Sequence, residues 1–212
     1  MPLVYQQNIN QHTKLGVWHI GEEEAFFLER VPLHNAITHP HKRLQHLAGR
    51  FLLTELYDAF PLSLIQIADT RKPFLADDAY HFSISHCGDY AAAIVSSEHR
   101  VGVDIEIVSE KVNRIRHKFL VEEEMRMIGK LGQSPQQEIH THLVTLAWSI
   151  KESMYKWYGK GEVGFREHLR INAISINMDE FAARCTFQKS VPVEVEVHGL
   201  MFNGNILTWL VT

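Results

Sequence analysis

The sequence is poor in cysteine and has no long apolar run. Cys87 and Cys185 are the only cysteines among 212 residues, which excludes a disulfide framework and a Cys-x-x-Cys metal site. No apolar stretch approaches the roughly 20 residues that span a bilayer. The first residues also lack the basic and apolar regions of a signal peptide. We therefore expect a cytoplasmic protein that does not insert into membranes.

Positive charge is also scarce. The chain has 21 Lys and Arg residues against 25 Asp and Glu, a formal net charge of −4, whereas a general nucleic-acid-binding protein carries a basic surplus. No solenoid repeat and no low-complexity tract is visible. What remains is a composition that is 45% hydrophobic, in a chain long enough for one large domain or two small ones.

Segments with alternating or helical periodicity follow one another along the chain. Strands are expected at 14–20, 80–86, 91–95, 101–107, around 169–171, and at 183–188, 193–198 and 206–211. Helices are expected at 22–29, after Pro40, over much of 113–131 and at 143–158, with a polar loop at 129–137. This order predicts an α+β protein with a mainly antiparallel end, in two similar-sized lobes of residues 1–106 and 107–212.

The helix expected at 143–158 carries an acidic and a basic residue one turn apart. Its apolar stripe comprises Leu143, Leu146, Ala147, Ile150, Met154 and Trp157. Glu152 and Lys156 stand on the opposite side at i,i+4 spacing. Two interpretations are open: a surface ion pair, or a metal-binding carboxylate beside a phosphate-binding lysine.

The strand expected at 101–107 places two carboxylates on one face. Because side chains alternate along a strand, Val103 and Ile105 point one way while Asp104 and Glu106 point together to the other. Neighbouring carboxylates repel unless a positive charge lies between them. The segment is either an exposed strand or half of a divalent-cation site.

Two further charged segments have an ordinary and a functional interpretation. The helix after Pro40 carries Lys42, Arg43, His46 and Arg50 within about 100° of one another, which is either a solvated face or a site for an anion. The acidic run 122–124 is expected to begin a helix, where negative side chains complement the macrodipole.

Three motifs in order resemble the 4'-phosphopantetheinyl transferase superfamily, in its longer Sfp-type branch. The family's G-(I/V)-D-x-E strand is matched by residues 102–106, and its W-(S/T)-x-K-E-(A/S)-x-x-K helix by residues 148–156. The upstream G-K-P and F-N-x-S-H-S patterns are matched by residues 71–73 and 82–87, with Arg71 in place of the glycine, Ser83 in place of the asparagine and Cys87 in place of the final serine.

The resemblance implies a role for each matched residue. Asp104, Glu106 and Glu152 would hold Mg²⁺, and Lys156 would bind the pyrophosphate of coenzyme A and neutralise charge during transfer. Among the remaining matches, Ser85 and His86 correspond to phosphate contacts and Lys72 and Pro73 to the loop beside the adenine. Arg43 and His46 correspond loosely to contacts of the 3'-phosphate, and Glu124 or Glu152 to the general base.

The implied protein is a monomer of two pseudo-symmetric α/β lobes with the active site between them. It would transfer 4'-phosphopantetheine from coenzyme A to a serine of an apo acyl or peptidyl carrier protein, releasing adenosine 3',5'-bisphosphate. The carrier would serve fatty-acid, polyketide or nonribosomal peptide synthesis, and Arg114, Arg116, Lys118 and Arg126 are candidates for its docking rim. Two alternatives remain open: another Mg²⁺-dependent enzyme acting on a nucleotide diphosphate, and a non-catalytic module that binds coenzyme A or a carrier protein.

Overall fold

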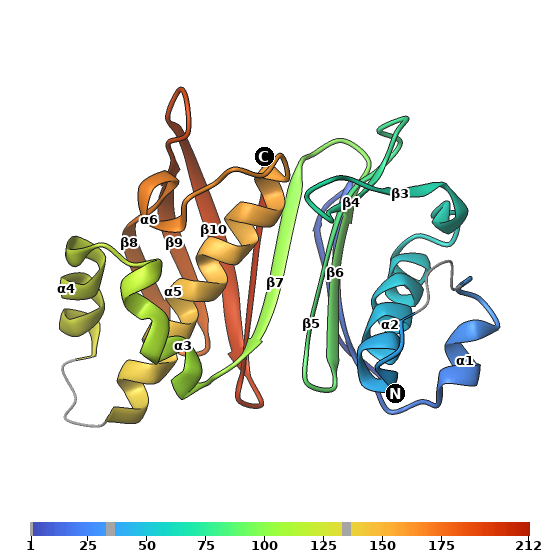
Figure 1. Cartoon of the computed structure of the whole chain (residues 1–212), viewed down its shortest axis with the longest axis horizontal. Helices are drawn as coiled ribbons and strands as arrows, with labels where there is room; N and C mark the ends of the chain where they lie inside the picture. The colour runs from blue at the N-terminus through green and yellow to red at the C-terminus, as the bar shows by residue number, and fades with distance from the viewer. Residues whose placement is uncertain (1, 33–36, 133–136) are drawn as a thin grey trace.

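A computed structural model of the chain describes residues 2–32, 37–132 and 137–212. Within these ranges two antiparallel sheets, of four and five strands, lie against long helices (Figure 1). This mixture confirms the predicted α+β class. No helix in the described part of the chain is both long and apolar enough to cross a membrane.

The first sheet is built from the N-terminal part of the chain, in the order β1-β2-β6-β5. Its strands are β1 (Leu3–Asn10), β2 (Thr13–His19), β5 (His81–Cys87) and β6 (Tyr90–Ser96). Helix α2 (Pro40–Leu56) packs on one face through Leu47, Phe51 and Leu52, and the short helix α1 (Glu24–Leu28) packs on α2. Proline at the first helical position begins α2, since its missing N–H would have had no helical partner there.

A small hairpin connects α2 to β5. The 3-10 turn η1 (Leu62–Leu64) leads into β3 (Ile65–Ile67), which pairs only with β4 (Pro73–Leu75) in the described residues. Pro73 therefore begins the second strand of this hairpin, directly after the loop that carries Arg71 and Lys72.

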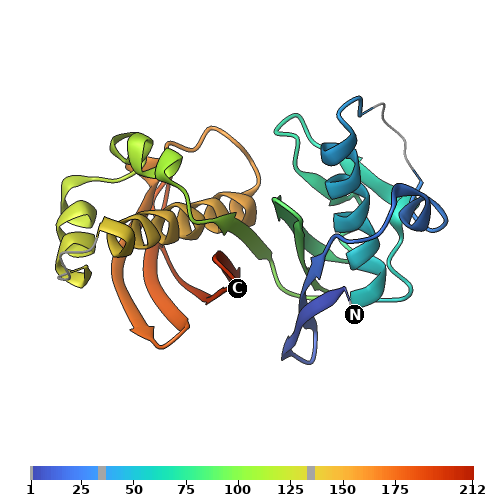
Figure 2. The same ribbon diagram turned by 90° about the horizontal axis from the view of Figure 1, so that it is seen from below.

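The second sheet has the order β7-β11-β10-β9-β8. Its strands are β7 (Val101–Ile107), β8 (Leu169–Asn177), β9 (Glu180–Phe187), β10 (Val193–Phe202) and β11 (Asn205–Val211). Helix α5 (Gln137–Tyr158) crosses one face of this sheet (Figure 2). The shorter elements beside it are α3 (Glu110–Ile115), η2 (Arg116–Lys118), α4 (Glu122–Leu131) and α6 (Phe165–His168).

The two sheets meet where edge strand β5 lies against edge strand β7, a contact that we call the seam. The strands are joined there by a side chain rather than by a ladder: the backbone N–H of Val103 donates to Ser83 Oγ at 3.2 Å. A separate apolar cluster, which includes Leu15, Ala92 and Trp209, packs the two sheets together. The seam therefore packs against apolar side chains on one side, and its polar residues face α5.

Gly102 permits α5 to approach β7 closely. A Cβ atom at this position would lie 2.1 Å from the carbonyl oxygen of Ser153, well inside van der Waals contact. No side chain larger than hydrogen is accommodated without moving the helix. This close approach sets the distance between the carboxylates of β7 and the polar side chains of α5.

The structure contains a strand that the sequence did not predict, β1 at the edge of the first sheet. Helix α4 ends at Leu131, where the predicted helical segment 113–131 ends, so the polar loop starts later than the predicted residue 129. Residues 133–136 of that loop lie outside the described residues. Strand β7 pairs with β11, so its residues belong to the second sheet. The predicted lobe boundary after residue 106 falls near the end of this strand, and the division into two lobes stays a prediction.

Candidate functional site

Asp104 is the centre of a buried hydrogen-bond cluster at the seam. Asp104 is 2% exposed, and its carboxylate accepts from Ser85 Oγ of β5 at 2.9 Å and from Lys156 Nζ at 2.7 Å, both on Oδ1. Its Oδ2 accepts from Ser149 Oγ of α5 at 2.8 Å. Strand β5, strand β7 and helix α5 thus each supply a group to one carboxylate.

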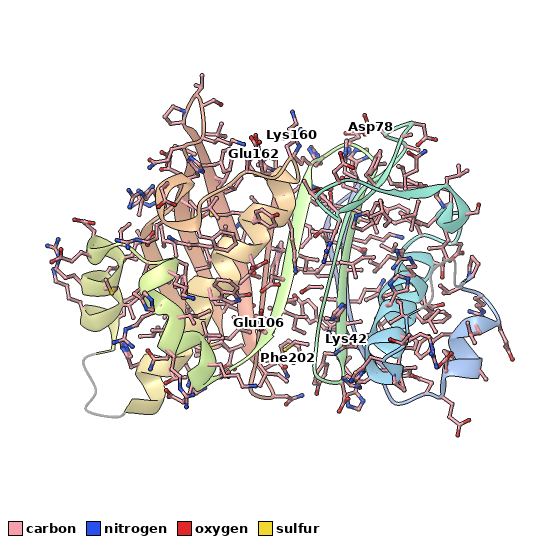
Figure 3. All side chains as sticks on the ribbon, in the orientation of Figure 1. Lys42, Asp78, Glu106, Lys160, Glu162 and Phe202 are labelled. Carbon is pink, nitrogen blue, oxygen red and sulfur yellow. The ribbon has the colours of Figure 1, made fainter. Side chains whose placement is uncertain are left out.

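Glu106 lies two residues further along the same face of β7, as alternation predicted. The Trp148 indole N–H donates to its Oε1 at 3.1 Å, and the Cys87 thiol lies 3.7 Å from its Oε2. Burial and the neighbouring Asp104 raise the pKa of Glu106 to about 7. Figure 3 shows Glu106 in the lower part of the seam, at the same end of the molecule as the labelled Lys42 and Phe202.

Glu152 is the third predicted carboxylate and is partly buried on α5. Burial, followed by repulsion from Asp104, raises its pKa to about 7, while Lys156 opposes the shift. The surface ion pair that i,i+4 spacing allowed is absent from the described residues, since the Lys156 ammonium is bonded to Asp104 instead. Three carboxylates therefore influence one another electrostatically, and only one of them has the lysine.

The predicted Mg²⁺ ligands are neighbours but are not arranged as a metal site. Among the side chains that the structure describes, in residues 2–32, 37–132 and 140–212, no three Asp, Glu, His or Cys are placed to hold a metal ion. The reason is local: the Asp104 oxygens are taken by Lys156 and two hydroxyls, and Glu106 is turned to Trp148. The donor set itself, oxygen ligands with an excess of negative charge, suits a hard divalent cation.

Lys156 connects the carboxylates to a pocket. The Lys156 side chain is 24% exposed, and its ammonium also donates to Ser85 Oγ at 2.7 Å. The pocket has a volume of about 200 Å³, and its lining includes Pro73, Phe82 and Ile84. Its remaining walls are Thr70, Arg71, Lys72, Ser83, Tyr155, Lys156 and Gly159, so that three cations and no acidic side chain face it.

Lys72 ties the hairpin loop to the end of α5. Its ammonium donates to the carbonyl oxygen of Lys156 at 2.5 Å. Burial, followed by the charge of Arg100, lowers the pKa of Lys72 to about 8. Pro73 begins β4 beside it and lines the same pocket. The predicted loop residues and the predicted phosphate-binding lysine are therefore brought together.

His86 extends the polar surface of the site from Lys156 toward α2. Its ring is exposed, yet desolvation by neighbouring groups and the nearby Lys156 charge lower its pKa. His46 on α2 is also close to His86, and burial together with Arg50 lowers the pKa of His46 to about 4. Arg50 donates to His46 Nδ1 at 3.0 Å, so His46 is a neutral acceptor in this state.

Arg43 is not directed to the seam. It forms a two-pronged ion pair with Glu24 of α1, with an Nη2–Oε2 distance of 2.7 Å and an Nε–Oε1 distance of 2.8 Å, and it donates to the carbonyl of Ile37. These contacts fasten α1 to α2. The predicted 3'-phosphate role of Arg43 stays a prediction, and this geometry gives it no support.

Glu124 also lies apart from the three carboxylates, in a pair with Lys151. The Lys151 ammonium is wholly buried and bonds to Glu124 Oε2 at 2.7 Å and to the carbonyl of Phe119 at 2.6 Å. Glu124 additionally accepts from the backbone N–H groups of Val121 and Ile171. Both of its oxygens are thus engaged in fastening α4 and β8 to α5, and its predicted role as base remains untested.

Three residues at the site were not singled out from the sequence. Ser149 orients Asp104, Trp148 orients Glu106, and Cys87 contacts Glu106 from β5. The signal for Ser149 and Trp148 was their place in the helical motif itself. For Cys87 the signal was the alternation of β5, which puts residues 83, 85 and 87 on one face.

Comparison with known proteins assigns the chain to a family. The model of the 4'-phosphopantetheinyl transferase superfamily matches residues 100–208, about half of the chain, and includes β7, α4 and α5. The chain therefore belongs to the 4'-phosphopantetheinyl transferase superfamily, and the resemblance drawn from the three motifs is confirmed.

Individual relatives match at modest identity. Enterobactin synthase component D of Salmonella austin is 32% identical over 115 residues, 54% of this chain and 47% of the relative. The transferase gsp of Aneurinibacillus migulanus is 38% identical over 90 residues, 42% of this chain and 35% of the relative. The transferase ffp of Bacillus subtilis is 30% identical over 128 residues, 60% and 50% of the two chains. The chain spans about half the length of the curated relatives it matches.

Proposed function

We propose that the protein transfers 4'-phosphopantetheine from coenzyme A to a serine of an apo acyl or peptidyl carrier protein, in a Mg²⁺-dependent reaction. The observation that carries the proposal is the cluster of Asp104, Lys156 and Ser85, which adjoins a pocket with three cations and no acid. A pyrophosphate donor requires carboxylate oxygens that hold its metal ion on one side and cationic groups that bind its phosphates on the other. We infer the reaction that this arrangement performs from the chain's membership of the family.

Positioning and charge neutralisation dominate phosphoryl transfer. Lys156 would bind the pyrophosphate and offset charge that develops on the transferred phosphate, because its ammonium lies between the carboxylates and the pocket. Ser85 already bonds to that ammonium and would hold it in place or donate to a phosphate oxygen. Lys72 and Pro73 would line the nucleotide end, and His86 would contact a phosphate from the exposed side of β5.

Asp104, Glu106 and Glu152 would hold Mg²⁺, as the resemblance implies. These residues suit a divalent cation because they carry an excess of negative charge: Lys156 alone offsets three neighbouring carboxylates. When bound, Mg²⁺ would supply the Lewis acidity that polarises the pyrophosphate and stabilises the leaving group. Lys156 would then move from Asp104 to the substrate, which frees Oδ1 of the carboxylate.

Of the two predicted bases, Glu152 is the better supported. Both oxygens of Glu124 accept hydrogen bonds from Lys151 or the backbone, whereas Glu152 makes no side-chain hydrogen bond within the described residues. We therefore assign Glu152, directly or through a water, to take the proton of the carrier serine.

We further infer two pseudo-symmetric lobes with the site between them, in a monomeric cytoplasmic protein that binds neither nucleic acid nor membrane. In support, each antiparallel sheet has one long helix on one face, α2 or α5, and the proposed catalytic residues come from both sides of the seam. The carrier would approach the Glu106 end, where exposed Arg114, Arg116 and Lys118 follow β7 in the chain.

Acidic carrier proteins suit such a rim, and charge complementarity raises association rates more than affinity. If Arg114, Arg116 and Lys118 receive the carrier, its association rate should fall steeply as ionic strength rises. A rate unchanged between low and high salt would remove these residues from the docking surface.

The decisive experiment is incubation of the protein with coenzyme A, Mg²⁺ and several apo carrier proteins, followed by mass spectrometry of each carrier. We expect the mass of one phosphopantetheine group on at least one carrier and equimolar adenosine 3',5'-bisphosphate. Nucleotide turnover without a carrier adduct would indicate a different Mg²⁺-dependent enzyme. Binding of coenzyme A with no turnover would indicate a non-catalytic module.

A further inference from the structure

Three residues with hydroxyl side chains follow one another at four-residue intervals along α5. Thr145, Ser149 and Ser153 are each 0% exposed, so each hydroxyl needs a partner inside the protein. The Thr145 hydroxyl donates to the carbonyl of Thr141 at 2.9 Å, and the Ser153 hydroxyl donates to the carbonyl of Ile150 at 2.8 Å. Such bonds to the preceding turn are common for serine and threonine inside a helix.

Ser149 is the exception, because its hydroxyl donates out of the helix to Asp104 Oδ2 at 2.8 Å. Thr208 of β11 lies against it and is the residue that pairs with Asp104 across the ladder between β7 and β11. Thr208 is 0% exposed, and its hydroxyl donates to the carbonyl of Ser149 at 2.9 Å and lies 3.0 Å from the Ser149 hydroxyl. Two strands and the helix are therefore joined through Thr208, Ser149 and Asp104.

The acceptors around Thr208 and Ser149 determine where their two hydroxyl protons lie. A charged carboxylate oxygen is a stronger acceptor than a hydroxyl, so the single Ser149 proton lies toward Asp104. The Thr208 proton has the carbonyl and the hydroxyl oxygen of Ser149 as acceptors, and with either one it leaves the Ser149 proton to Asp104. Rotation of Ser149 toward its own helix would break the contact with Thr208 as well as the bond to Asp104.

The packing of β11 does not require a hydroxyl at position 208. The residues around it in the strand, Ile206, Leu207, Trp209 and Leu210, are apolar and buried. Valine has the same branched shape, suits a strand equally well and brings no polar atom into the interior. The hydroxyl of Thr208 is therefore explained by its contacts with Ser149.

We propose that Thr208 is a positioning residue of the metal site. It holds the Ser149 hydroxyl on Asp104 Oδ2, which keeps the carboxylate turned so that Oδ1 is the oxygen presented to Lys156 and, once Lys156 has moved to the substrate, to Mg²⁺. Hydrogen bonds behind a metal ligand orient it and tune the affinity for the metal. The inference rests on the proposed function, in which Asp104 is a ligand of Mg²⁺.

The test measures metal affinity, transfer kinetics and thermal stability in the same variants. Mn²⁺, which favours the same oxygen ligands as Mg²⁺, is titrated into the protein saturated with coenzyme A, and electron paramagnetic resonance reports the free ion. Thr208→Val should weaken Mn²⁺ binding about tenfold and raise the KM for Mg²⁺ by a similar factor. The kcat at saturating Mg²⁺ should change by less than about twofold, because excess metal fills the weakened site.

Three further variants separate the hydroxyl of Thr208 from its methyl group and from Ser149. Thr208→Ser keeps the hydroxyl, so it should bind Mn²⁺ like the wild type while loss of the methyl group lowers Tm by about 2–4 °C. Ser149→Ala should weaken Mn²⁺ binding about 10- to 100-fold, because Asp104 loses its bond directly. Adding Thr208→Val to Ser149→Ala should weaken binding no further, since Thr208 acts only through Ser149.

Thr145→Val is the matched control for Thr208→Val. It removes a hydroxyl from an equally buried threonine that bonds to a helix carbonyl at the same 2.9 Å, but whose contacts are with Thr141 and Ser109. Both variants should lower Tm by about 2–4 °C, because each loses one buried hydrogen bond. Only Thr208→Val should weaken the binding of Mn²⁺.

Contrary outcomes distinguish the positioning role from the proposed function. Wild-type Mn²⁺ affinity in Thr208→Val, or a defect that Thr208→Ser does not repair, overturns the positioning role. An equal loss of affinity in Thr145→Val also overturns it, since any buried hydroxyl would then have the same effect. A wild-type protein that binds coenzyme A but no Mn²⁺ overturns the metal role of Asp104 in the proposed function, and the inference falls with it.

Discussion

Helix α5 carries two lysine–carboxylate pairs of the same length in two different environments. Lys151 bonds to Glu124 and Lys156 bonds to Asp104, both at 2.7 Å. The Lys151 and Glu124 side chains are 0% and 2% exposed, whereas Lys156 is 24% exposed and faces a pocket. The first pair is closed by backbone groups, and the second is open to a ligand.

The difference shows what separates a structural ion pair from a functional one. Every partner of Lys151 is a fixed group of the fold, including the carbonyl oxygens of Phe119 and Phe165. Lys156 instead has two uncompensated carboxylates near it, Glu106 and Glu152, whose pKa values are both raised to about 7. A closed pair resists change, while an open pair can exchange its partner for a substrate phosphate or a cation.

The largest effect should follow from breaking the closed pair. Lys151→Met leaves the Glu124 charge buried without its cation, and we expect a loss of about 3–5 kcal/mol in the free energy of unfolding. Denaturant unfolding monitored by circular dichroism measures it. The control Lys160→Met, at an exposed position, should stay within about 0.5 kcal/mol of the wild type. A loss as small as that of the control would mean that the pair is not structural.

Breaking the open pair should mainly affect catalysis. Lys156→Met should reduce the rate of phosphopantetheine transfer roughly 10²–10³-fold, because the charge on the transferred phosphate loses its neutralising group. The free energy of unfolding should fall by only about 1–2 kcal/mol, since Asp104 keeps the hydroxyls of Ser85 and Ser149. Transfer assays and thermal melts on one preparation give both numbers. If the free energy of unfolding falls as far as in Lys151→Met while the transfer rate is unchanged, the distinction between the two ion pairs is wrong.

The two predicted bases should respond in opposite ways to a neutral substitution. Glu124→Gln should destabilise the fold by about 1–3 kcal/mol and leave the turnover of the folded fraction largely intact, since it weakens hydrogen bonds to buried donors. Glu152→Gln should reduce turnover at least 10²-fold and leave the fold intact. Turnover corrected for the folded fraction distinguishes them. Loss of turnover in a fully folded Glu124→Gln protein would transfer the catalytic role to Glu124.

The smallest effect concerns pH and stability. The pKa of Glu152 is raised from 4.5 to about 7 by burial and Asp104, so the folded protein binds more protons than the unfolded chain between these values. The free energy of unfolding of the wild type should therefore fall, relative to Glu152→Gln, as pH rises from 4.5 to 7. After solvent screening the difference is on the order of 1 kcal/mol. Parallel melts across this range in metal-free buffer measure it, and parallel curves would contradict it.

Much of the site was predictable because strand alternation and helix periodicity are local. Alternation placed Asp104 and Glu106 on one face of β7, and it is borne out by their shared contacts with β5 and α5. Strand β1 was missed because it is an edge strand, paired only with β2 in the part of the chain that the structure describes, and has a mostly polar second half, Gln6 to Asn10. Because few positions of β1 are buried, its sequence shows little alternation of apolar and polar residues.

Periodicity also misjudged the second side of α5. One apolar stripe predicted one buried face, yet Thr145, Ser149 and Lys151 are wholly buried as well. The helix is enclosed by β7 and β11 on one side and by α4 and β8 on others, and a sequence pattern records only the apolar neighbours. Polar residues buried by hydrogen bonding look the same in sequence as polar residues in water.

The sequence by itself determined most of the helices and strands, the α+β class, the family motifs and the residues that share a strand or helix face. These depend on neighbours within a few residues along the chain. Only the tertiary structure decided that Lys156 bonds to Asp104 rather than Glu152, that Lys151 and Glu124 are a closed pair, and that Arg43 fastens α1. The physical reason is that partner choice depends on distance and burial between segments far apart in sequence, which local periodicity does not contain.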